Sequence, residues 1–267
     1  MKKQIFLTVF AVALAVILVS LPAAAATTEV HLVRYAADGS TVLDEMAVDY
    51  LWMEANLPVL GDGLTHYYHQ GPTFNESDLW DPAEYQNVET RDMGAVKGTA
   101  VSDLCDLVGG MAPGDILRVQ AKDGFYKNFS YQTVYGEDGR KGVMGLAWYV
   151  GQDSVTGDPQ GEGYVPDYYD GMRLIFFADT SANPWGWHVF GDNDMRETMP
   201  EDEWHLFSGK WPSSSGLSVK HVNKLLIYPG EGTEGGDTSP DLPPTQASPL
   251  GIAVLLAALA VGIALRI

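Results

Sequence analysis

Apolar segments at both ends of the chain limit which residues can form a globular fold. Two lysines near the start precede an apolar stretch from Ile5 to Leu21 and a row of alanines that ends at Ala26. A basic start, an apolar centre and an Ala-x-Ala end are typical of a secretory signal peptide. We therefore expect residues 1–26 to be removed on export and the mature chain to begin at Thr27.

The second apolar segment, Leu250 to Leu265, contains only Leu, Ile, Ala, Val and Gly. Its length is close to the shortest that crosses a bilayer, about 17 residues. It has no polar face of the kind that a helix of a soluble core shows. We expect residues 249–267 to be a transmembrane anchor or a sorting segment, and the Pro-, Gly- and Ser-rich residues 229–248 to be a disordered stalk.

The remaining residues, 27–228, are enough for one domain with a substantial core. Cys105 is the one cysteine, so no intrachain disulfide can form, although the signal peptide places the domain outside the cytoplasm. Stability must then come from packing, which the seven Trp and thirteen Tyr residues favour.

A net charge of −19 disfavours nucleic acid and anionic lipid headgroups as partners. The expected partners are the membrane, through the tail, and a small ligand or another component of the envelope. Asn75 and Asn128 each begin an Asn-x-Ser sequon, so both are candidate glycosylation sites.

Local patterns predict the first elements of the domain. Residues 29–35 and 41–48 are expected to form a hairpin across the Asp38-Gly39 turn. Residues 50–57 are expected to form a short helix that ends before a proline. The stretch 61–98 is rich in Gly, Pro, Asn and aromatic residues and is expected to be a long loop.

The clearest helix pattern follows that stretch. Leu104, Leu107, Val108 and Met111 recur at helical spacing, with Ser102 as the expected N-cap. Alternating and apolar runs then predict strands, and the mixture predicts a β-rich α+β domain. The expected strands are 116–121, 125–131, 145–150, 172–178, 185–190 and 217–228.

The order of these features resembles the molybdopterin-binding domain of the sulfite oxidase family. The matching pieces are Gly98 and Val101 leading into the helix 102–110, the strand 116–121 with its Asp123-Gly124-Phe125 turn, and the segments 145–150, 170–174 and 216–222. The resemblance implies a single fold of that type, a molybdopterin cofactor and an oxidoreductase activity.

The chain departs from that family where the metal would be bound. A cysteine thiolate ligates molybdenum in the family from the loop before this helix, but the corresponding residues 65–72 contain no cysteine, and Cys105 falls within the helix. Lys and Arg are sparse, so no set that would hold a pterin phosphate is evident. We expect a non-catalytic domain without a cofactor; the alternative is a molybdopterin-dependent oxidoreductase with altered metal ligation.

Three histidines offer another chemistry. His66 and His69 are three residues apart, and His188 follows two tryptophans. Neutral imidazoles near carboxylates can bind zinc, iron or nickel, which would make the protein a carrier of a metal or a tetrapyrrole. Hydrogen-bonded packing is the other reading of the same residues.

A group of aromatic residues is the candidate ligand site. Its members are separated by Pro, Gly and Asp, as in an open cleft where flat rings stack on a sugar or another apolar ligand. Packing in the core is the alternative. These residues are Tyr164, Tyr168, Tyr169, Trp185 and Trp187.

The acidic run Asp192-Asn193-Asp194 lacks the glycine and the final glutamate of a helix-loop-helix calcium site, so we expect an acidic surface turn. The tail, the stalk and the acidic charge resemble archaeal surface proteins with C-terminal sorting segments, although residues 248–251 depart from the usual Pro-Gly-Phe signature. The sequence thus predicts an exported, membrane-anchored module of the cell surface, which binds a ligand or helps to build the envelope.

Overall fold

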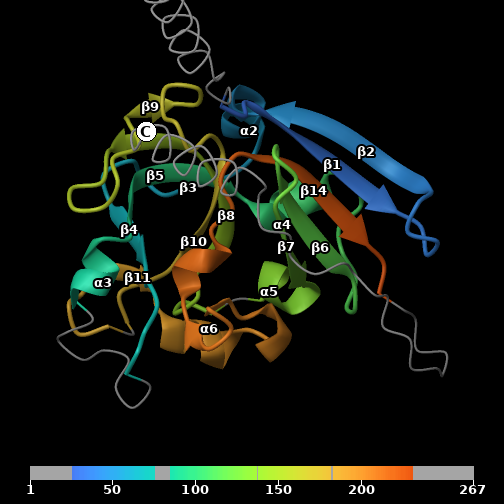
Figure 1. Cartoon of the computed structure of the whole chain (residues 1–267). Coiled ribbons are helices and arrows are strands. Elements are labelled where there is room, and N and C mark those ends of the chain that lie inside the picture. Colours follow the sequence, from blue (N-terminus) through green and yellow to red (C-terminus); the bar gives the residue numbers. More distant parts are fainter. Residues whose placement is uncertain (1–25, 76–84, 137, 182, 231–267) are drawn as a thin grey trace, which may run out of the picture.

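The computed structural model describes residues 26–75, 85–136, 138–181 and 183–230. They form two open β-sheets and a small hairpin, with short helices between and around the sheets (Figure 1). Nearly all of the expected signal peptide, the expected anchor and all of the stalk from residue 231 lie outside these residues. Within the described ranges, no helix is both long and apolar enough to cross a membrane.

The first and last strands of the domain lie side by side in a five-stranded sheet of order β2-β1-β14-β6-β7. β1 and β14 pair in parallel, and the other neighbours are antiparallel. Both expected hairpins are confirmed. The strands are β1 (Glu29–Tyr35), β2 (Val42–Asp49), β14 (Val222–Tyr228), β6 (Ile116–Ala121) and β7 (Tyr126–Ser130).

The second sheet has seven strands, with the path β10-β8-β5-β4-β11 and two short strands, β3 and β9, paired to β5 and β8. A separate hairpin joins β12 (Leu206–Phe207) to β13 (Trp211–Pro212). The seven strands are β3 (Val59–Leu60), β4 (His66–His69), β5 (Asp92–Ala100), β8 (Val143–Gln152), β9 (Gly163–Tyr164), β10 (Arg173–Phe177) and β11 (His188–Phe190).

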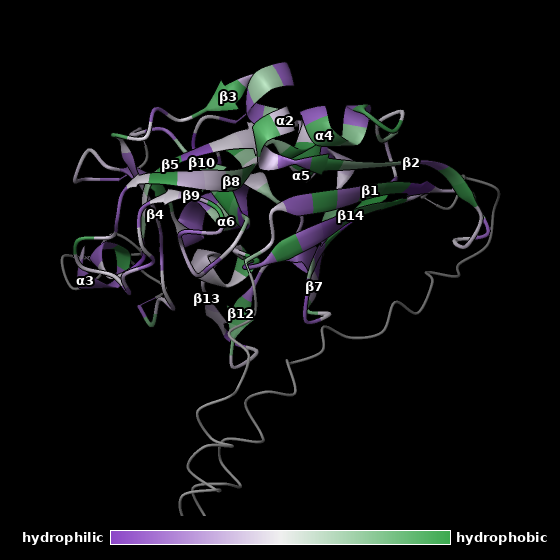
Figure 2. Ribbon diagram, turned by 90° about the horizontal axis from the view of Figure 1, so that it is seen from above, coloured by the Kyte–Doolittle hydropathy of each residue, from purple (hydrophilic) through white to green (hydrophobic). Residues whose placement is uncertain are grey.

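Helices α4 and α5 lie between the two sheets, where they contact β5, β6, β7 and β8 (Figure 1). The core on either side of them contains Leu117, Phe129, Leu146 and Trp148, all fully buried. Seen from above in Figure 2, polar and apolar residues alternate along β1. The helical segments are α2 (Tyr50–Asn56), α3 (Tyr85–Glu89), α4 (Val101–Asp106), α5 (Tyr131–Tyr135), α6 (Asp192–Thr198), η2 (Glu201–Glu203) and η3 (Ser214–Leu217).

Helix α2 matches its prediction closely, because its signals are local. The Asp49 carboxylate accepts a hydrogen bond from the Trp52 N–H at 2.8 Å and so caps the start. Leu57 ends the helix in an extended conformation, as the residue before Pro58 must.

The prediction of a long loop over 61–98 is wrong, because β4, α3 and most of β5 lie within it. β4 pairs with β11, which is distant in sequence, and with β5, which contains two glycines. The residues next to β4 in the sequence therefore give no sign of a strand.

The prediction for the following helix needs two corrections. Ala100 rather than Ser102 occupies the N-cap position, and Leu104 and Val108 are fully buried whereas Leu107 is half-buried.

The acidic surface turn expected at Asp192 and Asp194 is also wrong. These residues begin α6, and both side chains are fully buried. Asp192 accepts hydrogen bonds from the Thr73 hydroxyl at 2.5 Å and the Ser214 N–H at 2.6 Å. Asp194 accepts from the Gly191 N–H and pairs with Arg140. The carboxylates are buried because they satisfy donors from distant segments.

Candidate anion-binding cleft

The five aromatic residues singled out from the sequence do not line one cleft. Tyr168 is a core residue whose hydroxyl donates to the Ala147 carbonyl at 3.0 Å. Tyr164 stacks on Trp148 with parallel rings 5.9 Å apart. Tyr169 is exposed, and Lys220 Nζ lies 5.7 Å from the centre of its ring. Tyr168 and Tyr164 thus pack within the fold, which was the alternative reading, while ligand binding at Tyr169 stays a prediction.

Trp185 and Trp187 belong to a separate aromatic cluster. The ring of Trp187 stacks on Tyr68 at 4.8 Å and lies 5.0 Å from Tyr85, which also touches Trp185. The Asn183 amide holds this turn, since its oxygen accepts from the backbone N–H groups of both tryptophans. Both tryptophans are half-buried.

The three candidate histidines point in different directions. His69 is fully buried, and its Nε2 accepts a hydrogen bond from the Phe176 N–H at 3.3 Å. His188 Nδ1 lies 2.8 Å from the Ala178 carbonyl oxygen. His66 faces the buried carboxylate of Asp92, with Nδ1 3.0 Å from both oxygens.

No group of three or more His, Cys, Asp or Glu side chains in the described ranges is arranged to hold a metal ion. His66 and His69 alternate across β4 and therefore lie on opposite faces of the sheet. A shared metal site of the three histidines is therefore not what the geometry supports.

Three cationic side chains instead meet in a cleft of about 210 Å³, which we call the anion cleft. Arg173 at the start of β10 is buried, Lys220 just before β14 is partly exposed, and Arg91 just before β5 is exposed. The remaining lining residues are Thr90, Asp92, Met93, Asp158, Gln160 and Ser215.

Backbone pairing brings the first two cations together. The Leu174 N–H donates to the Val219 carbonyl at 2.9 Å, and the Val222 N–H donates to the Met172 carbonyl at 2.8 Å. Arg173 therefore lies beside the segment that carries Lys220, although the two are far apart in sequence.

The buried carboxylate of Asp170 orients both cations. Arg173 Nη1 lies 2.7 Å from one oxygen and Lys220 Nζ lies 2.8 Å from the other. Arg173 Nε also donates to the Ser218 hydroxyl at 2.7 Å. Burial lowers the pKa of Arg173, and the neighbouring Asp170 opposes that shift by favouring the charged form. One carboxylate thus holds two positive charges at the cleft.

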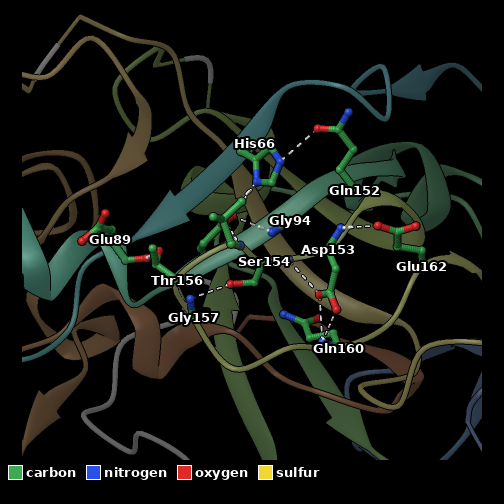
Figure 3. Close-up of polar contacts among 12 residues, drawn as sticks. His66, Glu89, Gly94, Gln152, Asp153, Ser154, Thr156, Gly157, Gln160 and Glu162 are labelled. Carbon is green, nitrogen blue, oxygen red and sulfur yellow. Dashed lines mark hydrogen bonds and ion pairs between the residues drawn. The ribbon is translucent and has the colours of Figure 1, made fainter.

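Gln160 completes the buried side of the cleft. With its amide nitrogen towards Asp170, it donates to the carboxylate at 3.0 Å and accepts from Arg173 Nη1 at 2.8 Å. The loop that carries it is held by Asp153, whose carboxylate accepts from the N–H groups of Gln160 and Gly161 (Figure 3). The cleft is therefore a rigid arrangement on its inner side and open at Arg91.

An aromatic compartment adjoins the anion cleft and shares Thr90 and Arg91 with it. It measures about 550 Å³ and is lined by Pro72, Gln86, Asn87 and two exposed phenylalanines, Phe74 and Phe207. A ligand with an anionic group and an apolar ring would fit the two compartments together.

A larger cleft of about 680 Å³ lies elsewhere and includes Tyr67 and His188. It is lined by Asp103, Asp106, Asp138 and Asp179, so its charge is opposite to that of the anion cleft. Asp106, Asp138 and Asp179 already accept local hydrogen bonds, for example Asp106 from the Tyr135 hydroxyl at 2.6 Å. We therefore assign no ligand to it.

The anion-holding part of a molybdopterin site fits the cleft, whereas the metal-holding part does not. Cys105 is buried in α4 and lines neither compartment, and burial raises the pKa of its thiol, which disfavours the thiolate that a metal needs. In β4, the fully buried His69 accepts a hydrogen bond at Nε2, and its Nδ1 is buried without a hydrogen-bond partner.

Comparison with protein-family models, curated proteins and solved structures gives no significant match. The resemblance to molybdopterin-binding domains therefore stays a prediction from the residues. The sequence offered no signal for Arg91. It singled out the segments that carry Arg173 and Lys220, but nothing in it indicated that these segments lie side by side.

The two candidate glycosylation sites, Asn75 and Asn128, are both half-buried. Asn128 lies on β7, where its side-chain oxygen accepts a hydrogen bond from Arg118. Glycosylation of either residue stays a prediction.

Proposed function

We propose that the domain is a non-catalytic binding module, displayed on the outer side of a membrane, whose ligand carries a small oxyanion such as a phosphate. The convergence of Arg91, Arg173 and Lys220 carries this proposal. In a chain of net charge −19, three cations around one small cleft form a local exception to the field of the whole protein. Asp92 and Asp158 also line the cleft, so three positive and two negative side chains leave an excess of one positive charge, which favours an anion.

The donors of the cleft suit an oxyanion in number and kind. Guanidinium and ammonium groups donate several charge-assisted hydrogen bonds, which are about twice as strong as neutral ones. Asp170 satisfies only part of the donor capacity of Arg173 and Lys220. Arg91 donates to the Thr90 carbonyl at 3.2 Å and retains further N–H groups.

The resemblance to molybdopterin-binding domains supports the same kind of ligand. Two of the segments that carry the resemblance, 170–174 and 216–222, also supply Arg173 and Lys220. A fold of that type reused for binding explains why an anion cleft occurs together with a buried cysteine. The alternative, a molybdopterin-dependent oxidoreductase, requires a metal ligand other than Cys105.

The cellular address is part of the proposal. A signal peptide over residues 1–26 and an anchor or sorting segment over 249–267 would place the domain at the cell surface, held to the membrane. The mature protein is expected to fractionate with membranes. Recovery in the cytosol with both end segments intact would contradict this address.

Calorimetric titration of the full mature chain in detergent with inorganic phosphate and pyrophosphate, at low salt, tests the ligand class. Hydrogen bonds to charged groups contribute about 1.5–3 kcal/mol, so Lys220→Gln and Arg91→Gln should each weaken binding by roughly tenfold or more. Added salt should weaken binding in the wild type.

Lys224→Gln is the matched control, because Lys224 is an exposed lysine on β14 outside the cleft. The control should bind as the wild type does. Absence of phosphate and pyrophosphate binding in the wild type, or an equal loss in the control, would contradict the proposal.

A further inference from the structure

The expected first residue of the mature chain is built into the domain. Thr27 is 6% exposed, and its hydroxyl oxygen accepts a hydrogen bond from the buried Met172 N–H at 3.1 Å. The next residue, Thr28, accepts from the Tyr50 N–H through its carbonyl at 3.2 Å. The Ala-x-Ala pattern that ends at Ala26 thus adjoins a buried residue rather than a free arm.

Polar atoms from distant segments meet at Gly171. This residue has φ +60°, and a Cβ built on it would lie 2.8 Å from His221 Nδ1, 2.9 Å from Thr27 Oγ1 and 3.1 Å from the Thr27 nitrogen. The absence of a side chain lets these atoms approach. The Thr27 nitrogen and His221 Nδ1 therefore lie close together across Gly171.

Two acceptors in this region receive no hydrogen bond. His221 Nδ1 and Asp170 Oδ1 are buried atoms without a hydrogen-bond partner. Lys220 Nζ lies 2.8 Å from Asp170 Oδ1, so this oxygen has an ion-pair partner, whereas His221 Nδ1 has none. The His221 N–H donates to the Asp170 carbonyl at 2.8 Å, which places the two residues together. Unsatisfied buried acceptors are costly and indicate a missing donor.

Cleavage after Ala26 would supply that donor. Hydrolysis by a signal peptidase adds the hydroxyl of water to the Ala26 carbonyl carbon and a proton to the Thr27 nitrogen as the peptide bond breaks. The new amine takes up another proton at neutral pH, since α-amino groups titrate near pH 8. One amide N–H becomes an ammonium with three N–H donors and a positive charge.

We infer that the α-ammonium of Thr27 docks beside Gly171, where it donates to His221 Nδ1. Processing at Ala26 is then a step that completes the fold. The peptidase must cut before Thr27 is buried, so cleavage precedes the docking of β1. This inference does not depend on which ligand occupies the anion cleft.

The test compares the full mature chain beginning at Thr27 with a chain that begins two residues earlier and retains Ala25-Ala26. The chain that begins at Thr27 should unfold at a higher denaturant concentration at pH 7. Its amine should react with an acylating reagent at least about tenfold more slowly than in denaturant, because docking protects it. The extended chain should be less stable and should react freely.

Two further variants separate the contributions. Thr27→Val keeps the ammonium and removes the hydroxyl, so it should retain the protection of the amine. His221→Gln should reduce the difference in stability between the two chain starts. Equal unfolding midpoints for the two starts would overturn the inference, and so would an amine on Thr27 that reacts as fast in the folded protein as in denaturant.

Discussion

His69 Nε2 accepts a hydrogen bond from the backbone N–H of Phe176 at 3.3 Å, in the interior of the seven-stranded sheet. The acceptor role requires the proton to be on Nδ1, so the imidazole is neutral. Burial, together with the positive charge of Arg173, lowers the pKa of His69 to about 3. For His69, one of the three candidate metal ligands, the structure thus agrees with the other reading, a hydrogen-bonded group of the core.

This histidine makes stability depend on pH. The unfolded chain takes up a proton on His69 as the pH falls below about 6.5, whereas the folded chain does so only near pH 3. The contribution of His69 is therefore complete above about pH 6.5 and is lost progressively towards pH 3. Burial also lowers the pKa of His205, to about 4, which adds to the slope.

Urea unfolding between pH 7 and pH 4 should show this loss, and His205→Gln should make the slope shallower. His31→Gln is the control, because the His31 side chain is exposed and should leave the slope unchanged. A wild-type protein equally stable at both pH values would contradict the prediction.

Leu104 and Leu107 should differ strongly when shortened. Leu104 is fully buried in the core, so Leu104→Ala should lower the free energy of unfolding by roughly 2–5 kcal/mol. Leu107 is half-buried at the end of α4, so Leu107→Ala should lower the free energy of unfolding by less. Denaturant midpoints of the two variants measure the difference, and equal losses would show that the helix is rotated.

Trp187→Ala should lower the free energy of unfolding by roughly 1–3 kcal/mol, because Trp187 packs on Tyr68 and Tyr85. Phosphate affinity should not change, since Trp187 does not line the anion cleft. Thermal unfolding and calorimetry measure the two effects. Loss of ligand binding with unchanged stability would restore the aromatic cluster as the binding surface.

The native protein should carry no stoichiometric molybdenum or tungsten. The expectation follows from the burial of Cys105, whose thiol pKa is raised, and from the loop before α4, which has no cysteine. Alkylation of Cys105 should be slow in the folded protein and fast in denaturant. Elemental analysis that finds about one molybdenum or tungsten per chain would support the oxidoreductase instead.

The elements predicted correctly are those with local signals, such as the cap of α2 at Asp49 and the turn of the β6–β7 hairpin at Gly124. β4 was missed because it pairs with β11 and β5, which are not its neighbours in sequence, and because polar and apolar residues do not alternate along it. The burial of Asp192 was missed because its donors, Thr73 and Ser214, lie in other segments.

The anion cleft could not be read from the sequence for the same reason. Arg91, Arg173 and Lys220 are separated by long stretches of chain, and only the pairing of 170–174 with 218–222 brings two of them together. A low overall content of Lys and Arg says nothing about where those residues gather.

The position of β14 has a mechanical consequence. β14 lies between β1 and β6, and the stacking of Tyr228 on Tyr35, with ring centroids 5.0 Å apart, marks the end at which the chain leaves the sheet. If the tail holds the domain to a membrane as proposed, tension on the protein enters at Tyr228 and runs along β14. Its hydrogen bonds to β6 run across that pull and those to β1 are slanted to it, so both sets share the load and the domain should resist being pulled from its tether by shear.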